Sequence, residues 1–154
     1  MPKIILVLTL LLPSALFSQK YFDKTKQEVK KELENYVTAN KAFNPTLTET
    51  DTTLVLSITG QEKKTDSFVY GFDKTSGKCS YQRTMAGCDS CYKKYLNDLL
   101  NQKEYAWKKI NGNQYVSKFA SHLMLELPFD KDDFTFTLFR ASWTKELYDI
   151  LIKN

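Results

Sequence analysis

The stretch DTTLVLSITGQEKKTDSFVYGFDKTSGKCSYQRT (51–84) decides the fold, because it holds three strand-like segments separated by two polar turns. Apolar and polar residues alternate in residues 53–58 and again in residues 67–72, which is the two-residue period of a half-buried strand. A third strand is expected at residues 78–84. The stretch therefore predicts an antiparallel meander whose apolar rows share one face.

An amphipathic helix is predicted ahead of this meander, in residues 21–40, because apolar residues recur there at helical spacing between lysines and glutamates. Thr25 and Glu28 match the S/T-x-x-E pattern of a capping box. Asp23 is an alternative N-cap two residues earlier. Pro45 ends the segment, because proline disfavours helix in the residue before it.

A second helix is predicted after the meander, with Asp89 as its N-cap and apolar residues on one side. A hairpin follows it around Asn111-Gly112, the dipeptide that favours a two-residue turn with positive φ at both positions. Ser142 is expected to cap a terminal helix. The predicted hairpins join 105–110 with 114–119 and 123–127 with 134–139; the apolar side of the terminal helix is Trp143, Leu147, Ile150 and Leu151.

These elements predict one α+β domain over residues 19–154. Its mainly antiparallel sheet has about six to seven strands, arranged as a meander and hairpins. The N-terminal, central and C-terminal helices are expected to pack on one face of the sheet. The other face, which is rich in threonine and serine, is expected to contact water.

Residues 1–18 match a secretory signal peptide. Lys3 supplies the positive charge of the n-region, and residues 4–12 form the apolar h-region. The residues that follow form the c-region, which contains the small residues of a cleavage site. Cleavage is expected before Gln19, with a cut after Ala15 as the alternative. The apolar core is short of the roughly 20 residues of a membrane span. The sequence therefore predicts a secreted or periplasmic chain with no integral membrane segment after cleavage.

Composition excludes several classes of function. The chain has 154 residues, and its 22 Lys and Arg against 18 Asp and Glu give a net charge of +4 without a basic block. No nucleic-acid partner is therefore expected. Five glycines and one histidine argue against a glycine-rich phosphate loop and a site with several histidines, so no cofactor and no catalytic residue is predicted.

The motif with an enzymatic interpretation is Cys88-Asp89-Ser90-Cys91, because a helix N-terminus favours the thiolate of a C-x-x-C pair. Cys88 would be the nucleophile and Cys91 the resolving thiol. The motif resembles the redox pair of thioredoxin-like proteins at four positions only. In those proteins the pair lies in a βαβ unit opposite a proline loop. Here a hairpin follows the helix, and Pro128 is the one downstream proline.

The three cysteines also allow structural bridges in an oxidising compartment. Loop closure gives roughly 2.8 kcal/mol for a Cys79–Cys91 bridge and roughly 2 kcal/mol for Cys88–Cys91. These values favour the longer bridge, and either pairing leaves one cysteine over. A zinc site is a further alternative, with Cys79, Cys88, Cys91 and His122 as ligands, although the second half-site lacks paired spacing.

A candidate binding surface contains one cation and four aromatic side chains. Arg83 is expected on the same face as Cys79 and Tyr81, where it either packs its stem at the core edge or binds an anionic partner. The aromatic side chains would mark a partner surface if exposed, and otherwise pack under a helix. They are Tyr105, Trp107, Tyr115 and Phe139.

The sequence thus predicts a non-catalytic binding or interaction module that is stabilised by a disulfide. One alternative is a thiol–disulfide oxidoreductase that uses Cys88 and Cys91. Another is a periplasmic immunity or inhibitor protein against an envelope-acting toxin. The sequence does not identify the partner.

Overall fold

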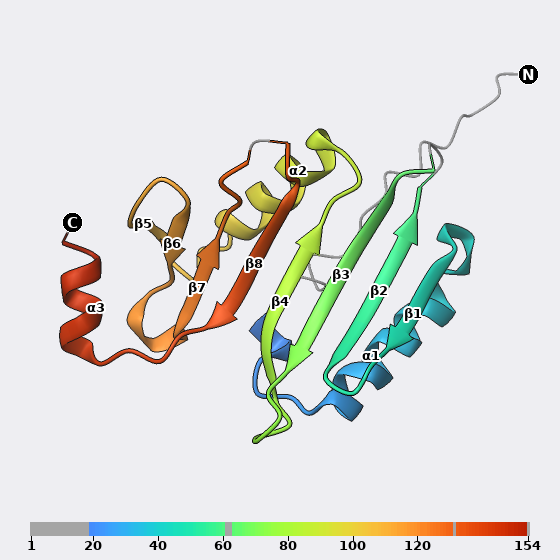
Figure 1. The fold of residues 1–154 in the computed structure, drawn as a ribbon, viewed down its shortest axis with the longest axis horizontal. Helices are drawn as coiled ribbons and strands as arrows, with labels where there is room; N and C mark the ends of the chain where they lie inside the picture. Colours follow the sequence, from blue (N-terminus) through green and yellow to red (C-terminus); the bar gives the residue numbers. More distant parts are fainter. Residues whose placement is uncertain (1–18, 61–62, 131, 154) are drawn as a thin grey trace, which may run out of the picture.

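A computed structural model describes residues 19–60, 63–130 and 132–153 (Figure 1). The predicted signal peptide, residues 1–18, lies outside the described residues. The helices are α1 (Lys26–Ala39), α2 (Asp89–Leu100) and α3 (Lys145–Leu151), with 3-10 turns at Gln19–Tyr21, Lys41–Phe43 and Phe119–Ser121. The strands are β1 (Pro45–Glu49), β2 (Thr53–Thr59), β3 (Thr65–Phe72), β4 (Cys79–Met85), β5 (Lys108–Lys109), β6 (Gln114–Val116), β7 (Leu123–Glu126) and β8 (Thr135–Arg140).

The eight strands form one sheet in the order β1-β2-β3-β4-β8-β7-β6-β5, and every neighbouring pair is antiparallel. The predicted meander and both predicted hairpins are confirmed. Strand β1 is not predicted from the sequence, because Pro45 indicates only the end of a helical segment. Pro45 is the first residue of an edge strand, a position where its missing N–H is tolerated.

One face of the sheet carries the core. A single row of paired residues crosses five strands on this face: Leu54, Tyr70, Gln82, Leu138 and Leu125. Helix α1 covers this face with Val29 and Leu33, and α2 covers it with Tyr95 and Leu99. The opposite face is lined with threonines and serines of β1, β2, β3 and β8, as predicted.

Helix α3 does not share the face that α1 and α2 cover. Its Tyr148 packs with Trp143 and Val116, and Val116 pairs with Met124 on the opposite face of the sheet. The Tyr148 hydroxyl donates to the carbonyl of Ser117 at 3.0 Å. The prediction that all three helices pack on one face is therefore wrong.

The expected apolar side of α3 is correct for Trp143 and Leu151, which pack in this cluster, but wrong for Leu147 and Ile150. Leu147 is 47% exposed and Ile150 is 59% exposed, whereas Tyr148 is buried. The helix packs through its single tyrosine and its C-terminal apolar residues, because the surface it meets is the narrow strip of β6 and β7 rather than the wide core.

The predicted capping box of α1 is confirmed. Thr25 accepts from the backbone N–H of Glu28, and the Glu28 carboxylate accepts from the Thr25 backbone N–H at 2.8 Å. The alternative cap, Asp23, instead has a φ of 70° and forms an ion pair with Arg140. The helix accordingly begins at Lys26 and not at residue 21.

The other two helix starts differ from prediction by one or two residues. Cys88 is the N-cap of α2, because its backbone is extended while Asp89 is already helical. Thr144 rather than Ser142 caps α3, through its hydroxyl and the N–H of Leu147. In each case a nearby residue with a suitable side-chain acceptor replaces the predicted one.

The hairpin at Asn111-Gly112 forms, but its turn is not the predicted two-residue type. Neither residue has a positive φ. The Ile110 N–H donates to the carbonyl of Gln114, and the Asn111 side chain accepts from the N–H of Asn113 at 3.0 Å. The asparagine thus stabilises a longer turn through its side chain, which is a common role for this residue.

The β3–β4 pairing contains an irregularity that changes which residues share a face. Phe72 pairs with Cys79 and Gly71 pairs with Tyr81, so one extra residue lies between the two partners on β4. Cys79 therefore faces the core, while Tyr81 and Arg83 face the open side. The prediction that these three share a face is wrong. The Tyr81 ring lies over Gly71, where a Cβ atom would approach it to 1.9 Å.

Candidate functional site

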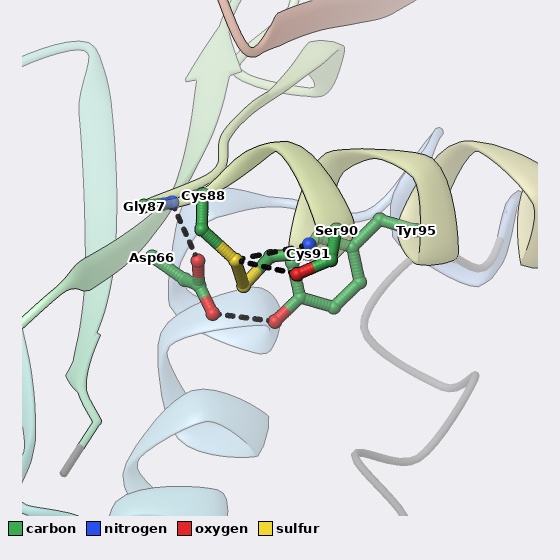
Figure 2. Close-up of a disulfide and its surroundings, with 6 residues drawn as sticks. All are labelled: Asp66, Gly87, Cys88, Ser90, Cys91 and Tyr95. Carbon is green, nitrogen blue, oxygen red and sulfur yellow. Dashed lines mark hydrogen bonds between the residues drawn. A yellow bond between two sulfur atoms is a disulfide. The ribbon is translucent and has the colours of Figure 1, made fainter. Parts of the chain in front are cut away.

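The disulfide at the start of α2 is the feature with the most specific chemistry (Figure 2). It joins Cys88 to Cys91, whose Cα atoms are 5.1 Å apart. The Cys88 sulfur accepts from the backbone N–H of Cys91 at 3.1 Å. The hydroxyl of Ser90 lies 3.2 Å from the same sulfur. Both cysteines are half-buried, and Cys91 packs against the core.

The position of the bridge favours negative charge on sulfur. Backbone N–H groups in the first turn of a helix have no helical partner, and the helix dipole is positive there. Cys88 is the N-cap of a helix of 12 residues. A thiolate at Cys88 would keep the N–H of Cys91 as a donor.

Asp66 connects the turn before the disulfide to the body of α2. One carboxylate oxygen accepts from the backbone N–H of Gly87 at 2.7 Å, and the other accepts from the Tyr95 hydroxyl at 2.6 Å. Figure 2 shows Asp66 next to the bridge, between these two donors. Burial and the hydrogen bond to Asp66 raise the pKa of Tyr95 well above its usual value.

Gly87 allows the turn to lie against β3. A Cβ atom at this position would come within 2.9 Å of the backbone nitrogen of Thr65. Any larger residue would push the turn away from the strand, and the hydrogen bond to Asp66 would lengthen. The close approach therefore fixes the cysteines relative to Asp66.

The favoured Cys79–Cys91 bridge is wrong, because Cys79 lies at the other end of β4. Met85 lies six residues along the strand from Cys79, and six steps of an extended strand correspond to roughly 20 Å. A disulfide needs Cα atoms within about 7 Å. Cys79 is a free thiol and only 3% exposed. Loop-closure entropy favoured the longer ring, but the extended strand makes it geometrically impossible.

The residues of the alternative zinc site are not brought together. His122 lies beside the cluster of α3, stacked on Trp143 with ring centroids 6.2 Å apart. Cys79 is at the far end of β4 from Cys88 and Cys91. Within the described ranges, no three His, Cys, Asp or Glu side chains are grouped as metal ligands would be.

The four aromatic residues predicted to mark a binding surface lie on different faces of the sheet. Tyr105 is 3% exposed, and its ring packs on Trp107, whose indole N–H donates to the carbonyl of Leu99 in α2. Tyr115 also packs against this core. Phe139 lies on the opposite face, where it pairs with Tyr81 and Met124. Three of the four aromatic side chains thus pack against the main core, and the predicted residues do not form one surface.

Arg83 lies in a shallow, open pocket of about 380 Å³ on the face opposite α2. Its Nε donates to the Thr137 hydroxyl at 3.1 Å. Phe129 at the rim is 88% exposed. The lining residues are Arg83, Glu126, Leu127, Pro128, Phe129, Asp133, Thr135, Phe136 and Thr137.

The sequence does not predict the residues that surround the disulfide or those that line the Arg83 pocket. The sequence predicts a polar turn at Asp66, whereas this residue is the second of β3. Phe129 and Asp133 belong to a segment interpreted only as a solvated turn, and Glu126 to the alternating strand before it. The sequence signal for the pocket was a phenylalanine next to a proline in a turn of otherwise charged residues.

Comparison of the chain with protein-family models, curated proteins and solved structures finds no match. The site is therefore interpreted from its own geometry. Among the helices in residues 19–60, 63–130 and 132–153, none combines the length and apolar character of a membrane span.

Proposed function

We propose that Cys88 and Cys91 are a redox-active pair that exchanges disulfides with thiols of a secreted or periplasmic protein. The single observation that carries this proposal is the bridge at the N-cap of α2, where the Cys88 sulfur accepts the N–H of Cys91. Such a position stabilises a thiolate, which is the reactive form in exchange. The predicted signal peptide supports an oxidising compartment.

A purely structural role explains the bridge less well. It closes a ring of four residues within one helical turn, so it ties no strand to any helix. Loop closure of this size is worth roughly 2 kcal/mol. The same turn is already attached to the sheet, because Gly87 donates to Asp66 and Ala86 donates to the carbonyl of Phe134 at 2.9 Å.

The exchange has two balanced steps. A thiolate of the partner attacks the Cys88 sulfur, the Cys88–Cys91 bond breaks, and Cys91 leaves as a thiolate that takes a proton from water. A second thiolate of the partner then attacks the partner sulfur of the mixed disulfide, and Cys88 leaves as a thiolate held by the N–H of Cys91. Two electrons pass to the protein, and the partner dithiol becomes a disulfide.

The purified full chain is expected to equilibrate with glutathione and to show a midpoint between about −120 and −270 mV, the range of exchange proteins. The redox state is read by alkylation and mass spectrometry. Cys88→Ser and Cys91→Ser should each abolish reduction of insulin disulfides above the rate with dithiothreitol alone, because each removes one half of the pair.

Cys79→Ala is the matched control, because it removes a cysteine that is buried and unbonded. It should keep the insulin activity and the midpoint of the parent chain. A midpoint below about −300 mV would assign the bridge a structural role. Equal loss of activity in all three variants would also overturn the proposal.

A second candidate function is binding of an anionic group at the pocket of Arg83, which would make the chain a binding module. Arg83 uses Nε on Thr137, and no carboxylate among the described residues forms an ion pair with its guanidinium. The other guanidinium nitrogens are suited to hold a carboxylate, for which Glu126 and Asp133 of the same pocket would compete. An immunity or inhibitor role stays a prediction, because no described feature distinguishes it from other binding functions.

Benzoate is a suitable probe of this pocket, because it combines a carboxylate with an apolar ring. We expect amide shifts at Arg83, Thr137 and Phe129 in an NMR titration, and at least tenfold weaker binding in Arg83→Gln because a charge-assisted pair is lost. Arg140→Gln is the control, since Arg140 pairs with Asp23 elsewhere. Shifts spread over the surface, or equal weakening in both variants, would contradict the pocket assignment.

A further inference from the structure

Asp66 contacts both ends of the segment that holds the cysteines. Gly87 directly precedes Cys88, and Tyr95 lies one helical turn beyond Cys91. Each carboxylate oxygen of Asp66 accepts a hydrogen bond from one of these two residues. A single side chain of β3 therefore spans the turn that carries the disulfide (Figure 2).

The surroundings keep this carboxylate in place. Tyr95 is 2% exposed, and its ring packs edge-on against Phe68 at a centroid distance of 5.7 Å. Gly87 lies too close to Thr65 for the turn to move inward. Asp66 is itself half-buried. A charge held in this way is screened by water less than one on the surface.

We infer that Asp66 is a positioning residue for the Cys88–Cys91 pair, which fixes the turn and holds a negative charge next to the thiolate that forms on reduction. This inference rests on the proposed redox function. A neighbouring like charge disfavours an anion, so Asp66 opposes the thiolate that the helix N-terminus favours. The balance of the two effects sets how readily the disulfide is reduced.

Two other charged residues lie near this turn, Asp89 and Lys64. Asp89 forms an ion pair with Lys93 at 2.6 Å, and both side chains are well exposed. Lys64 of the β2–β3 connection has a partner of its own. Tyr92 packs against Phe134 and Phe136. Asp66 is thus the half-buried carboxylate that accepts hydrogen bonds from both the turn before the disulfide and helix α2.

The test compares the thiol pKa of the reduced full chain with its glutathione equilibrium constant. Asp66→Asn keeps the size and one acceptor of the side chain but removes the charge. We expect the pKa of the Cys88 thiol, followed by thiolate absorbance, to fall by about one unit. The equilibrium constant at pH 7 should shift toward the dithiol by up to about tenfold, because the reduced form is stabilised.

Tyr95→Phe separates charge from packing. It removes a hydrogen bond to Asp66 but leaves the carboxylate, so the thiol pKa should stay constant or rise. Asp98→Asn is the matched control on α2, because Asp98 pairs with the exposed Lys94 far from the first turn. It should leave both quantities unchanged.

The outcomes distinguish this inference from the function on which it rests. If the parent chain does not equilibrate with glutathione, the proposed redox function is wrong. If it does, and Asp66→Asn leaves the thiol pKa unchanged, Asp66 is not a positioning residue for the pair. Shifts of the same sign in Asp66→Asn and Tyr95→Phe would assign Asp66 to packing alone and would also overturn the inference.

Discussion

Leu56→Ala is expected to lower the free energy of unfolding by about 2–5 kcal/mol. Leu56 is 0% exposed and lies in the middle of β2, where it pairs with Phe68 of β3 and Leu47 of β1. Removing its branched end leaves a cavity under α1 that the paired strands cannot close. Urea denaturation followed by circular dichroism measures the change.

Val55→Ala is the control for this prediction, because Val55 is the adjacent residue on the open face of the same strand. It pairs with Val69 and is half-buried, so its loss should cost about 1 kcal/mol or less. Both variants truncate an aliphatic side chain of β2 to alanine, but on opposite faces of the sheet. Equal losses in both would contradict the assignment of the core to the Leu56 face.

Sequence periodicity predicts the faces of β2 and β3 because alternation is a local property. Leu54, Leu56 and Ile58 share a face through the pleat of a single strand, whatever their neighbours are. The face that α3 covers could not be predicted in this way. It depends on Val116 and Met124, which lie on two other strands and become adjacent only through the β6–β7 pairing.

The C-x-x-C motif can be identified from the sequence, whereas the carboxylate of Asp66 beside it cannot. Asp66 is 22 residues before Cys88 in the chain (88 minus 66), and only the β3–β4 pairing brings the two ends together. The sequence also does not predict which face of the sheet Cys79 occupies. A one-residue irregularity in the pairing turns it into the core, and alternation alone assigns it to the wrong face.

Cys79 is expected to resist alkylation in the folded protein. Burial raises the pKa of its thiol from 9.0 to about 12. Three pH units correspond to about a thousandfold smaller thiolate fraction at pH 8, and the thiolate is the reactive form. With Cys88 and Cys91 bonded, Cys79 is the one free thiol, so iodoacetamide labelling followed by mass spectrometry reports on it alone.

The expected labelling rate in native buffer is about a thousandfold below that in urea, where the thiol has its ordinary pKa. Urea thus provides the reference within the same chain. Comparable rates in the two solvents would show that Cys79 is accessible in the folded state. That result would place the thiol outside the core and reopen its pairing with a partner.

The same buried thiol should make stability fall at alkaline pH. Below pH 9 the thiol is protonated in both states and contributes no pH dependence. Between pH 9 and about 12 the unfolded state loses the proton while the folded state keeps it, so the unfolded state binds fewer protons and stability falls as pH rises. The expected slope is about 1.4 kcal/mol per pH unit.

Cys79→Ala isolates this effect from the titration of tyrosines, which both chains share. The variant loses some stability at every pH because its side chain is smaller, but it lacks the thiol that titrates. The difference in free energy of unfolding between the two chains should therefore shrink above pH 9, and reverse sign where the thiol penalty exceeds the cavity cost. A difference that stays constant from pH 7 to 11 would show that the pKa of Cys79 is the same in the folded and unfolded chains.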